Sequence, residues 1–214
     1  MRIEIERLYD LFCQSNTKKD AKRLKECALE CEKLYFEDFT FREGSISGDI
    51  YDSLKDIMAK RKRKTKNRSE APTIGRVNFK LQKPKSKTAE GTFNASKNTI
   101  TIHPDFNDLW TLLHEMIHAY EDQLTYAQGE ILIIRLYNKL KEKIKNLDLV
   151  LTAWTHCVNQ ELLNDHGDHV ILFLLKSLDL DLRLNLPMGA ISGFYGTRKN
   201  TLETPAGKIK IELG

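Results

Sequence analysis

The sequence has little of what defines several large classes of protein. Its 214 residues include four cysteines, none of them in a CxxC pair, which is typical of a reduced chain inside a cell and not of a disulfide framework. No apolar run approaches the length of a membrane span, and the charges in residues 1–7 leave no room for the core of a signal peptide. We therefore expect a soluble, intracellular protein of the cytoplasm, nucleoid or nucleus, with no membrane partner.

Neither sign of charge dominates the composition. The formal net charge is +4, which permits contact with nucleic acid but does not require it. Internal repeats and low-complexity tracts are also lacking. Hydrophobic residues make up 41% of the chain, enough to bury one sizeable core.

Changes in residue pattern divide the chain into three parts, which we expect to form one compact domain. Residues 1–70 show apolar positions at helical spacing and end in a basic loop. Residues 71–182 form the central part, where β-prone and helical patterns follow one another. Residues 183–214 contain glycines among short β-prone runs, which predicts a C-terminal β-hairpin extension.

The central part predicts a small antiparallel sheet followed by helices, so the expected fold class is α+β. Alternating or β-branched runs predict strands at residues 77–81, 91–94 and 99–102. Apolar residues at helical spacing predict helices over residues 109–120, 131–144, 149–163 and 169–178. Asp105, Asn107 and Asp108 are candidate caps for the first of these helices.

The motif with the clearest chemistry lies on the first of these helices. Residues 111–120 read TLLHEMIHAY and contain an HExxH pattern formed by His114, Glu115 and His118. Residues four apart share a helix face, so both imidazoles can bind one ion while Glu115 lies beside it. A catalytic zinc leaves its fourth position to water, and Glu115 would accept a proton from that water as it attacks a carbonyl.

The third ligand is open between several residues. The Gly and His of a metzincin would fall on Glu121 and Leu124, so that class is excluded. A Glu from a following helix would be Glu161, as in a gluzincin. His166, which precedes a glycine, is the favoured choice, and His169 is a further option.

These motifs resemble the SprT-like, or Spartan-like, metalloprotease domain over residues 77–180. The segments KTAEGTFN at 87–94 and NTITIHP at 98–104 are similar to the strand pair that this family places before its active-site helix. TLLHEMIHAY at 111–120 is close to the family's zinc helix. HGDHVILFLLKSL at 166–178 is similar to its histidine-glycine motif and the helix that follows.

The resemblance implies a fold, a cofactor and a reaction. The fold would be a zincin, with the small sheet packed on the active-site helix, and residues 71–182 would be the protease core. One Zn²⁺ would be held by His114, His118 and His166, with Glu115 as the base. The activity would be an endopeptidase acting on DNA-associated or DNA-crosslinked proteins in DNA repair, with DNA as a possible activator.

A basic run in residues 60–68 is the candidate nucleic-acid-binding element. Its cations could neutralise several phosphates in a sequence-independent, salt-dependent way. A charge run is also typical of a solvated loop or a localisation signal. The candidate contact residues are Arg61, Lys62, Arg63, Lys64, Lys66 and Arg68.

Two other functions remain open from the residues alone. One is a gluzincin-type peptidase that uses Glu161 and has no link to DNA. The other is a non-catalytic DNA-binding or scaffold module, against which the presence of Glu115 in the motif argues. For a protease, the strand at residues 98–103 is a candidate edge strand that pairs with extended substrate; the alternative is an ordinary buried strand with no exposed edge.

Overall fold

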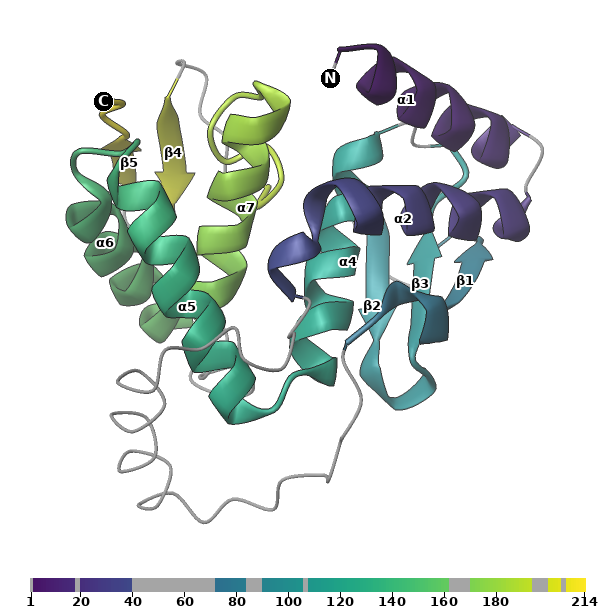
Figure 1. The fold of residues 1–214 in the computed structure, drawn as a ribbon, viewed down its shortest axis with the longest axis horizontal. Helices are drawn as coiled ribbons and strands as arrows, with labels where there is room; N and C mark the ends of the chain where they lie inside the picture. Colours follow the sequence, from purple (N-terminus) through teal and green to yellow (C-terminus); the bar gives the residue numbers. More distant parts are fainter. Residues whose placement is uncertain are drawn as a thin grey trace.

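The described residues form a mixed α+β fold that is mostly helical (Figure 1). The computed structural model describes residues 2–17, 20–39, 72–83, 90–105, 108–161, 170–193, 200–204 and 207–214. The helices are α1 Arg2–Thr17, α2 Ala21–Tyr35, α4 Leu109–Gln123, α5 Tyr126–Lys141, α6 Leu147–Glu161 and α7 Val170–Leu184. The strands are β1 Asn78–Leu81, β2 Gly91–Asn94, β3 Thr99–Ile102, β4 Thr201–Thr204 and β5 Gly207–Lys210.

The three-stranded sheet has the order β1-β3-β2 and is mixed. β2 and β3 are antiparallel, as expected for strands joined by the short 3₁₀ turn Ala95–Lys97, but β1 is parallel to β3. The prediction of a purely antiparallel sheet was therefore wrong. The residue pattern predicted the strands but not their order in the sheet. β1 lies beside β3 and not beside β2, the next strand in the chain.

β3 occupies the centre of this sheet. It pairs with β1 on one side and β2 on the other, and all four of its residues are buried. The prediction that residues 98–103 form an edge strand for substrate was therefore wrong. Within the described residues, β2 pairs with β3 alone, and both strands pack against α4.

Helix α4 lies between the two halves of the molecule (Figure 1). The sheet and α2 pack on one side of it, and α7 packs on the other, with α5 against α7. Its N-terminus is capped by Asp108, whose Oδ1 accepts from the Trp110 N–H at 3.0 Å, as one of the predicted caps. It ends at Leu124, where Thr125 starts α5 with a capping box formed with Gln128.

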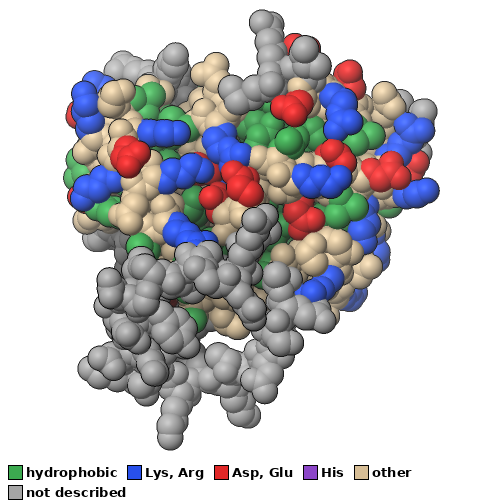
Figure 2. Space-filling view, in the orientation of Figure 1, with side chains coloured by type: hydrophobic (Ala, Val, Ile, Leu, Met, Phe, Trp, Pro, Cys, Tyr) green, Lys and Arg blue, Asp and Glu red, His purple; other side chains and the backbone are tan. Residues whose placement is uncertain are grey.

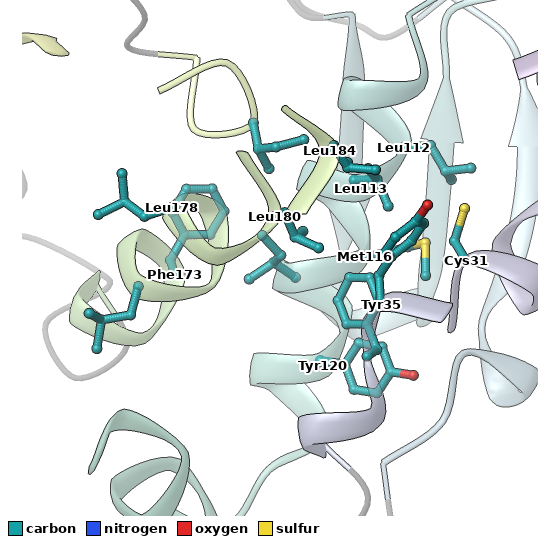
Figure 3. Close-up of a cluster of buried hydrophobic side chains, with 14 of the residues drawn as sticks. Cys31, Tyr35, Leu112, Leu113, Met116, Tyr120, Phe173, Leu178, Leu180 and Leu184 are labelled. Atoms are coloured by element: carbon teal, nitrogen blue, oxygen red, sulfur yellow. The ribbon is translucent and has the colours of Figure 1, made fainter. Parts of the chain in front are cut away.

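One buried apolar cluster joins all of these elements. Leu112, Leu113 and Met116 of α4 are fully buried, and Figure 3 shows them in one cluster between Leu184 of α7 and Cys31 of α2. Tyr120 stacks on Phe36 at 4.9 Å between ring centroids. Burial of each such side chain contributes about 1.5–3 kcal/mol, so the backbone of α4 is anchored on both sides.

The predicted C-terminal hairpin is confirmed, because β4 and β5 pair in antiparallel fashion.

The surface carries both signs of charge. Lys or Arg side chains are interspersed with Asp or Glu side chains over the face shown in Figure 2. No helix in the described part of the chain is both long and apolar enough to cross a membrane.

Candidate metal centre

The candidate site is built on the middle of α4. His114 and His118 lie one helical turn apart, and their Nε2 atoms approach to 3.2 Å. Two ligands on a tetrahedral zinc at roughly 2.0–2.1 Å lie about 3.3 Å apart. The structure thus brings the two imidazoles of the HExxH pattern together at the separation that one such ion requires.

The ring of His114 is fixed from a distant part of the chain. Its Nδ1 lies 2.8 Å from the carbonyl oxygen of Ile191. A carbonyl can only accept, so Nδ1 carries the proton. Burial lowers the pKa of His114 to about 4, assisted by His118 and opposed by the Ile191 bond. The ring is therefore neutral at pH 7, and its Nε2 presents a lone pair toward His118.

The ring of His118 is held by a carboxylate and an aromatic ring. Its Nδ1 lies 3.4 Å from Oε2 of Glu121, one turn further along the helix. This distance gives a charge contact that favours a proton on Nδ1. Phe173 of α7 stacks on the His118 ring at 4.6 Å and meets the His114 ring edge-on at 4.8 Å. The His118 side chain is 41% exposed, so the pair is open to solvent on this side.

The two Nε2 atoms can face each other in two ways. If the proton of His118 is on Nε2, this N–H donates to the lone pair on Nε2 of His114. With a proton on Nδ1 of both rings, the Nε2 atoms of His114 and His118 point their electron pairs at one another across 3.2 Å. Such an arrangement is repulsive unless a cation lies between them. A metal ion satisfies it, and so does a second proton on His118. Metal-binding histidines characteristically donate their other N–H to a carbonyl or carboxylate. His114 does so to the Ile191 carbonyl, and Nδ1 of His118 lies near the Glu121 carboxylate.

Glu115 is buried beside this pair, between α4 and β2. Its side chain is 5% exposed. Burial raises the pKa of Glu115 to about 8, and a backbone hydrogen bond from Phe93 opposes that rise. A cation at the histidine pair would lower this pKa, because an opposite charge favours the ionised form. Glu115 can thus change from acid to base on metal binding.

Gly91 makes room for Glu115. A Cβ at this position would lie 2.7 Å from Cγ2 of Thr111 and 3.0 Å from Cγ of Glu115. Both neighbours belong to α4, and Thr111 is β-branched, so neither can move away freely. The absent side chain at residue 91 lets the strand approach the helix closely enough for its backbone to reach the Glu115 carboxylate.

The edge of β2 faces this carboxylate. The carbonyl of Glu90 accepts from the His103 N–H at 2.8 Å, so residue 90 points its backbone toward β3. In an antiparallel ladder alternate residues point the opposite way. Gly91 and Phe93 therefore direct their backbone groups away from β3, in agreement with the Phe93 hydrogen bond to Glu115.

The structure does not place every predicted site residue. His114 and His118 are brought together, and Glu115 lies on the same helix with its side chain against β2. His166, His169 and the basic residues 61–68 lie outside the described residues, and the side chain of Glu161 is not described. Within the part that is described, no group of three or more His, Cys, Asp or Glu side chains gathers around a common point.

Several residues that shape the site were missed from the sequence. Gly91 gave a weak signal, as a glycine inside a predicted strand. Phe173 and Glu121 looked like ordinary helix positions, although Glu121 falls three residues after His118. The Ile191 carbonyl gave none, because a backbone group has no residue-type signature.

Comparison with known proteins adds no assignment to this geometry. No protein-family model matches the chain, and no curated protein or solved structure matches it either. The case for a function therefore depends on the side chains around α4 and on the residue pattern of the chain.

Proposed function

We propose that this protein is a zinc-dependent endopeptidase of the SprT-like type. The observation that supports it best is the pair of Nε2 atoms at 3.2 Å, with the Nδ1 of each ring facing an oxygen acceptor. Histidine nitrogen is a preferred zinc ligand, and the separation fits a tetrahedral ion. The residues present therefore fit the metal that the HExxH pattern predicts.

The third ligand in this proposal is His166. Helix α7, which begins four residues after it, packs directly on α4 and brings Phe173 onto both imidazole rings. The chain thus returns to the histidine pair just after this residue. Glu161, at the end of α6, is the alternative and would make the enzyme a gluzincin-type peptidase.

The chain's own groups divide the chemical work among them. Bound Zn²⁺ would act as a Lewis acid toward the scissile carbonyl and would make water a better nucleophile. Glu115, ionised once a cation lies beside it, accepts the proton of the attacking water and can pass it to the leaving amine. The half-exposed side of His118 provides the route by which solvent and substrate enter.

The outward backbone of β2 is the proposed docking edge for the substrate. Gly91 offers its N–H and carbonyl, and Phe93 its carbonyl, to an extended peptide, which would add as a further strand. This edge lies next to Glu115, so a bond held there would be within reach of the base.

The substrate class in this proposal comes from the SprT-like resemblance. It comprises proteins that are bound or crosslinked to DNA. The basic side chains of residues 61–68 would then hold the enzyme on DNA through phosphate contacts. DNA would act by bringing enzyme and substrate together.

Metal content and proteolysis test the enzymatic part of the proposal. Purified protein should retain about one zinc per chain, and His114→Ala, His118→Ala and His166→Ala should each lose it. Glu115→Gln should keep the metal and the fold but lose cleavage of casein or of a DNA-bound protein. His103→Ala is the matched control, because His103 contacts Asp105 and not the pair.

The outcomes separate the alternatives. Retention of zinc in His166→Ala together with its loss in Glu161→Ala would identify the gluzincin-type site. Full proteolysis by Glu115→Gln would exclude the mechanism. A chain that binds no divalent metal and cleaves nothing would leave the non-catalytic DNA-binding or scaffold function.

DNA binding is tested separately by fluorescence anisotropy. Single-stranded and duplex DNA are titrated at two salt concentrations, with wild type and with a variant in which the six basic residues of 61–68 are replaced by Ser. Phosphate contacts predict weaker binding at higher salt and a smaller salt dependence in the variant. Equal DNA binding by wild type and the variant would show that the basic residues of 61–68 do not contact DNA.

A further inference from the structure

We propose that Asp181 is a positioning residue that fixes the His114 ring through the backbone of Ile191. The carboxylate of Asp181 holds the N–H of Ile191, and the carbonyl of the same residue accepts the Nδ1 proton of His114. Asp181 touches neither the imidazoles nor the expected ion, so it acts only through the backbone between them. The inference uses the proposed function only in naming the ion that His114 binds.

The hydrogen bonds form a continuous chain from α7 to α4. Oδ2 of Asp181 accepts from the Gly189 N–H at 2.6 Å, and Oδ1 accepts from the Ile191 N–H at 3.0 Å. His114 then donates to the Ile191 oxygen at 2.8 Å. Both carboxylate oxygens of Asp181 therefore hold the turn after α7, and the Ile191 carbonyl in that turn orients the His114 ring.

The turn has few other ways to hold its shape. Gly189 adopts φ 90°, a left-handed conformation that L side chains rarely take. Within the turn, Ala190 donates to Pro187 and Gly193 to Ala190 at 3.0 and 3.3 Å. Each of these bonds spans only three residues. The turn is tied to helix α7 by the backbone bond from the Leu186 N–H to the Asp181 carbonyl at 2.8 Å, and beyond Leu186 by the two bonds to the Asp181 carboxylate.

The surroundings of Asp181 differ from those of a structural ion pair. Its side chain is fully buried, and its described partners are backbone N–H groups. Asp179, two residues earlier, has Lys139 at 2.8 Å and Lys176 at 3.4 Å. Burying a carboxylate against neutral donors costs stability, so this arrangement indicates a role for Asp181 beyond stability. We assign that role as holding the Ile191 carbonyl where it faces His114.

The ring tautomer of His114 tests the proposal directly. Nitrogen-15 NMR of metal-free wild type should show His114 as the Nδ1-protonated tautomer. Asp181→Asn replaces one acceptor oxygen by an NH₂ group that faces an N–H, so the turn should shift and His114 should become a tautomer mixture. Zinc affinity, from competition with a chelator, should fall by about tenfold, at the low end for groups that orient a ligand.

Asp179→Asn is the matched control. It removes a buried carboxylate from the same helix and should lower stability, yet leave the His114 tautomer and zinc affinity as in wild type. If Asp181→Asn does not fold, Asp181→Ser, which leaves room for a water, is measured in the same way. The absorption spectrum of bound Co²⁺ reports coordination geometry and should change in the Asp181 variants only.

The results distinguish the two proposals. An unchanged His114 tautomer in a folded Asp181 variant overturns the positioning role, whether or not metal binds. Equal effects of the Asp179 and Asp181 variants on the tautomer would also overturn it, since the role would then be general stability. If the tautomer shifts as expected between wild type and Asp181→Asn while wild type binds no zinc, that result would uphold this inference and reject the metalloprotease.

Discussion

Helix α7 lies beside two buried groups of ionisable side chains that are neutralised in different ways. The first, the ion-pair cluster, consists of Asp38, Lys139, Lys176, Asp179 and Arg183. The second, the metal-site cluster, consists of His114, Glu115, His118 and Asp181. The first opposes three cations to two carboxylates, whereas the second holds two carboxylates beside neutral groups.

The direction of the pKa shifts reports this difference. In the ion-pair cluster, burial raises the pKa of Asp38, but Lys176 and its neighbours outweigh burial and the net shift is downward. In the metal-site cluster, burial raises the pKa of Glu115 to about 8 and that of Asp181 to about 7. Cations offset the cost of burying a carboxylate in the first cluster. A carboxylate buried without a cation destabilises the fold, and such groups are characteristic of functional sites.

Removal of the buried lysine should give the largest effect on stability. Lys176 is fully buried, and its Nζ donates to the Tyr35 carbonyl at 2.6 Å and to Asp38 at 2.8 Å. Lys176→Met leaves Asp38 without its closest cation and takes a second cation from Asp179, which should lower the free energy of unfolding by about 3–5 kcal/mol. Urea denaturation measures this, with Lys141→Met, an exposed lysine, as the control.

The metal-site cluster should be unaffected by that change. The His114 tautomer and zinc affinity of Lys176→Met should equal those of wild type at temperatures where the variant is folded. A change in either would show that the two clusters are energetically coupled and would remove the distinction between them.

Glu115→Gln should change the pH dependence of stability in the metal-free protein. The pKa of Glu115 rises from 4.5 to about 8, so between these pH values the folded chain keeps a proton that the unfolded chain releases. The free energy of unfolding therefore falls as pH rises through this window. From pH 5 to pH 8, the loss should be about 2–4 kcal/mol smaller in Glu115→Gln than in wild type.

The measurement is urea denaturation at several pH values after chelation of metal. Zinc should flatten the wild-type curve, because a nearby cation stabilises the ionised carboxylate. Parallel curves for wild type and Glu115→Gln would mean that Glu115 is ionised in the metal-free fold, contrary to its buried setting.

Gly91→Ala should have an intermediate effect. The new Cβ would lie 2.7 Å from Thr111 and 3.0 Å from Glu115, and overpacking of this kind costs about 1–3 kcal/mol. Turnover should fall while zinc is retained, because the base moves and the ligands do not. Gly129→Ala is the control: its Cβ meets nothing within 4 Å in helix α5, so it should stabilise slightly.

Phe173→Leu should have the smallest effect. It removes the ring that contacts both imidazoles, at 4.6 and 4.8 Å, and aromatic pairs contribute about 0.5–1.5 kcal/mol beyond their buried area. Zinc affinity, measured by chelator competition, should fall by less than about tenfold. A complete loss of zinc would show that this ring, and not the oxygen acceptors that face Nδ1, positions the histidines.

The sequence predicted those parts of the fold that depend on local pattern. The apolar stripe of α4, its Asp108 cap and the three strands of the sheet were found where expected. The order of the strands was not predictable, because alternation records which residues are buried and not which strand lies beside which. The prediction of substrate pairing at residues 98–103 failed for the same reason.

The end of α7 shows a second limit. The predicted helix ended at Leu178, whereas α7 continues to Leu184 through residues 178–184, which read LDLDLRL. Asp179 and Asp181 can be buried there only because partners lie elsewhere in the chain, on α5 and in the turn after α7. Pattern cannot reveal such partners, so the HExxH residues were predictable and the groups that orient them were not.

The bond between His114 and Ile191 has a consequence for how the chain folds. It joins positions 77 residues apart, and contacts between such distant positions form late because a long loop must close first. A chain that ends before residue 191, whether nascent or clipped, would contain the whole of α4 and yet lack the oxygen that orients its first histidine. Orientation of the His114 ring therefore waits until the segment around residue 191 has been made and has folded back onto α4.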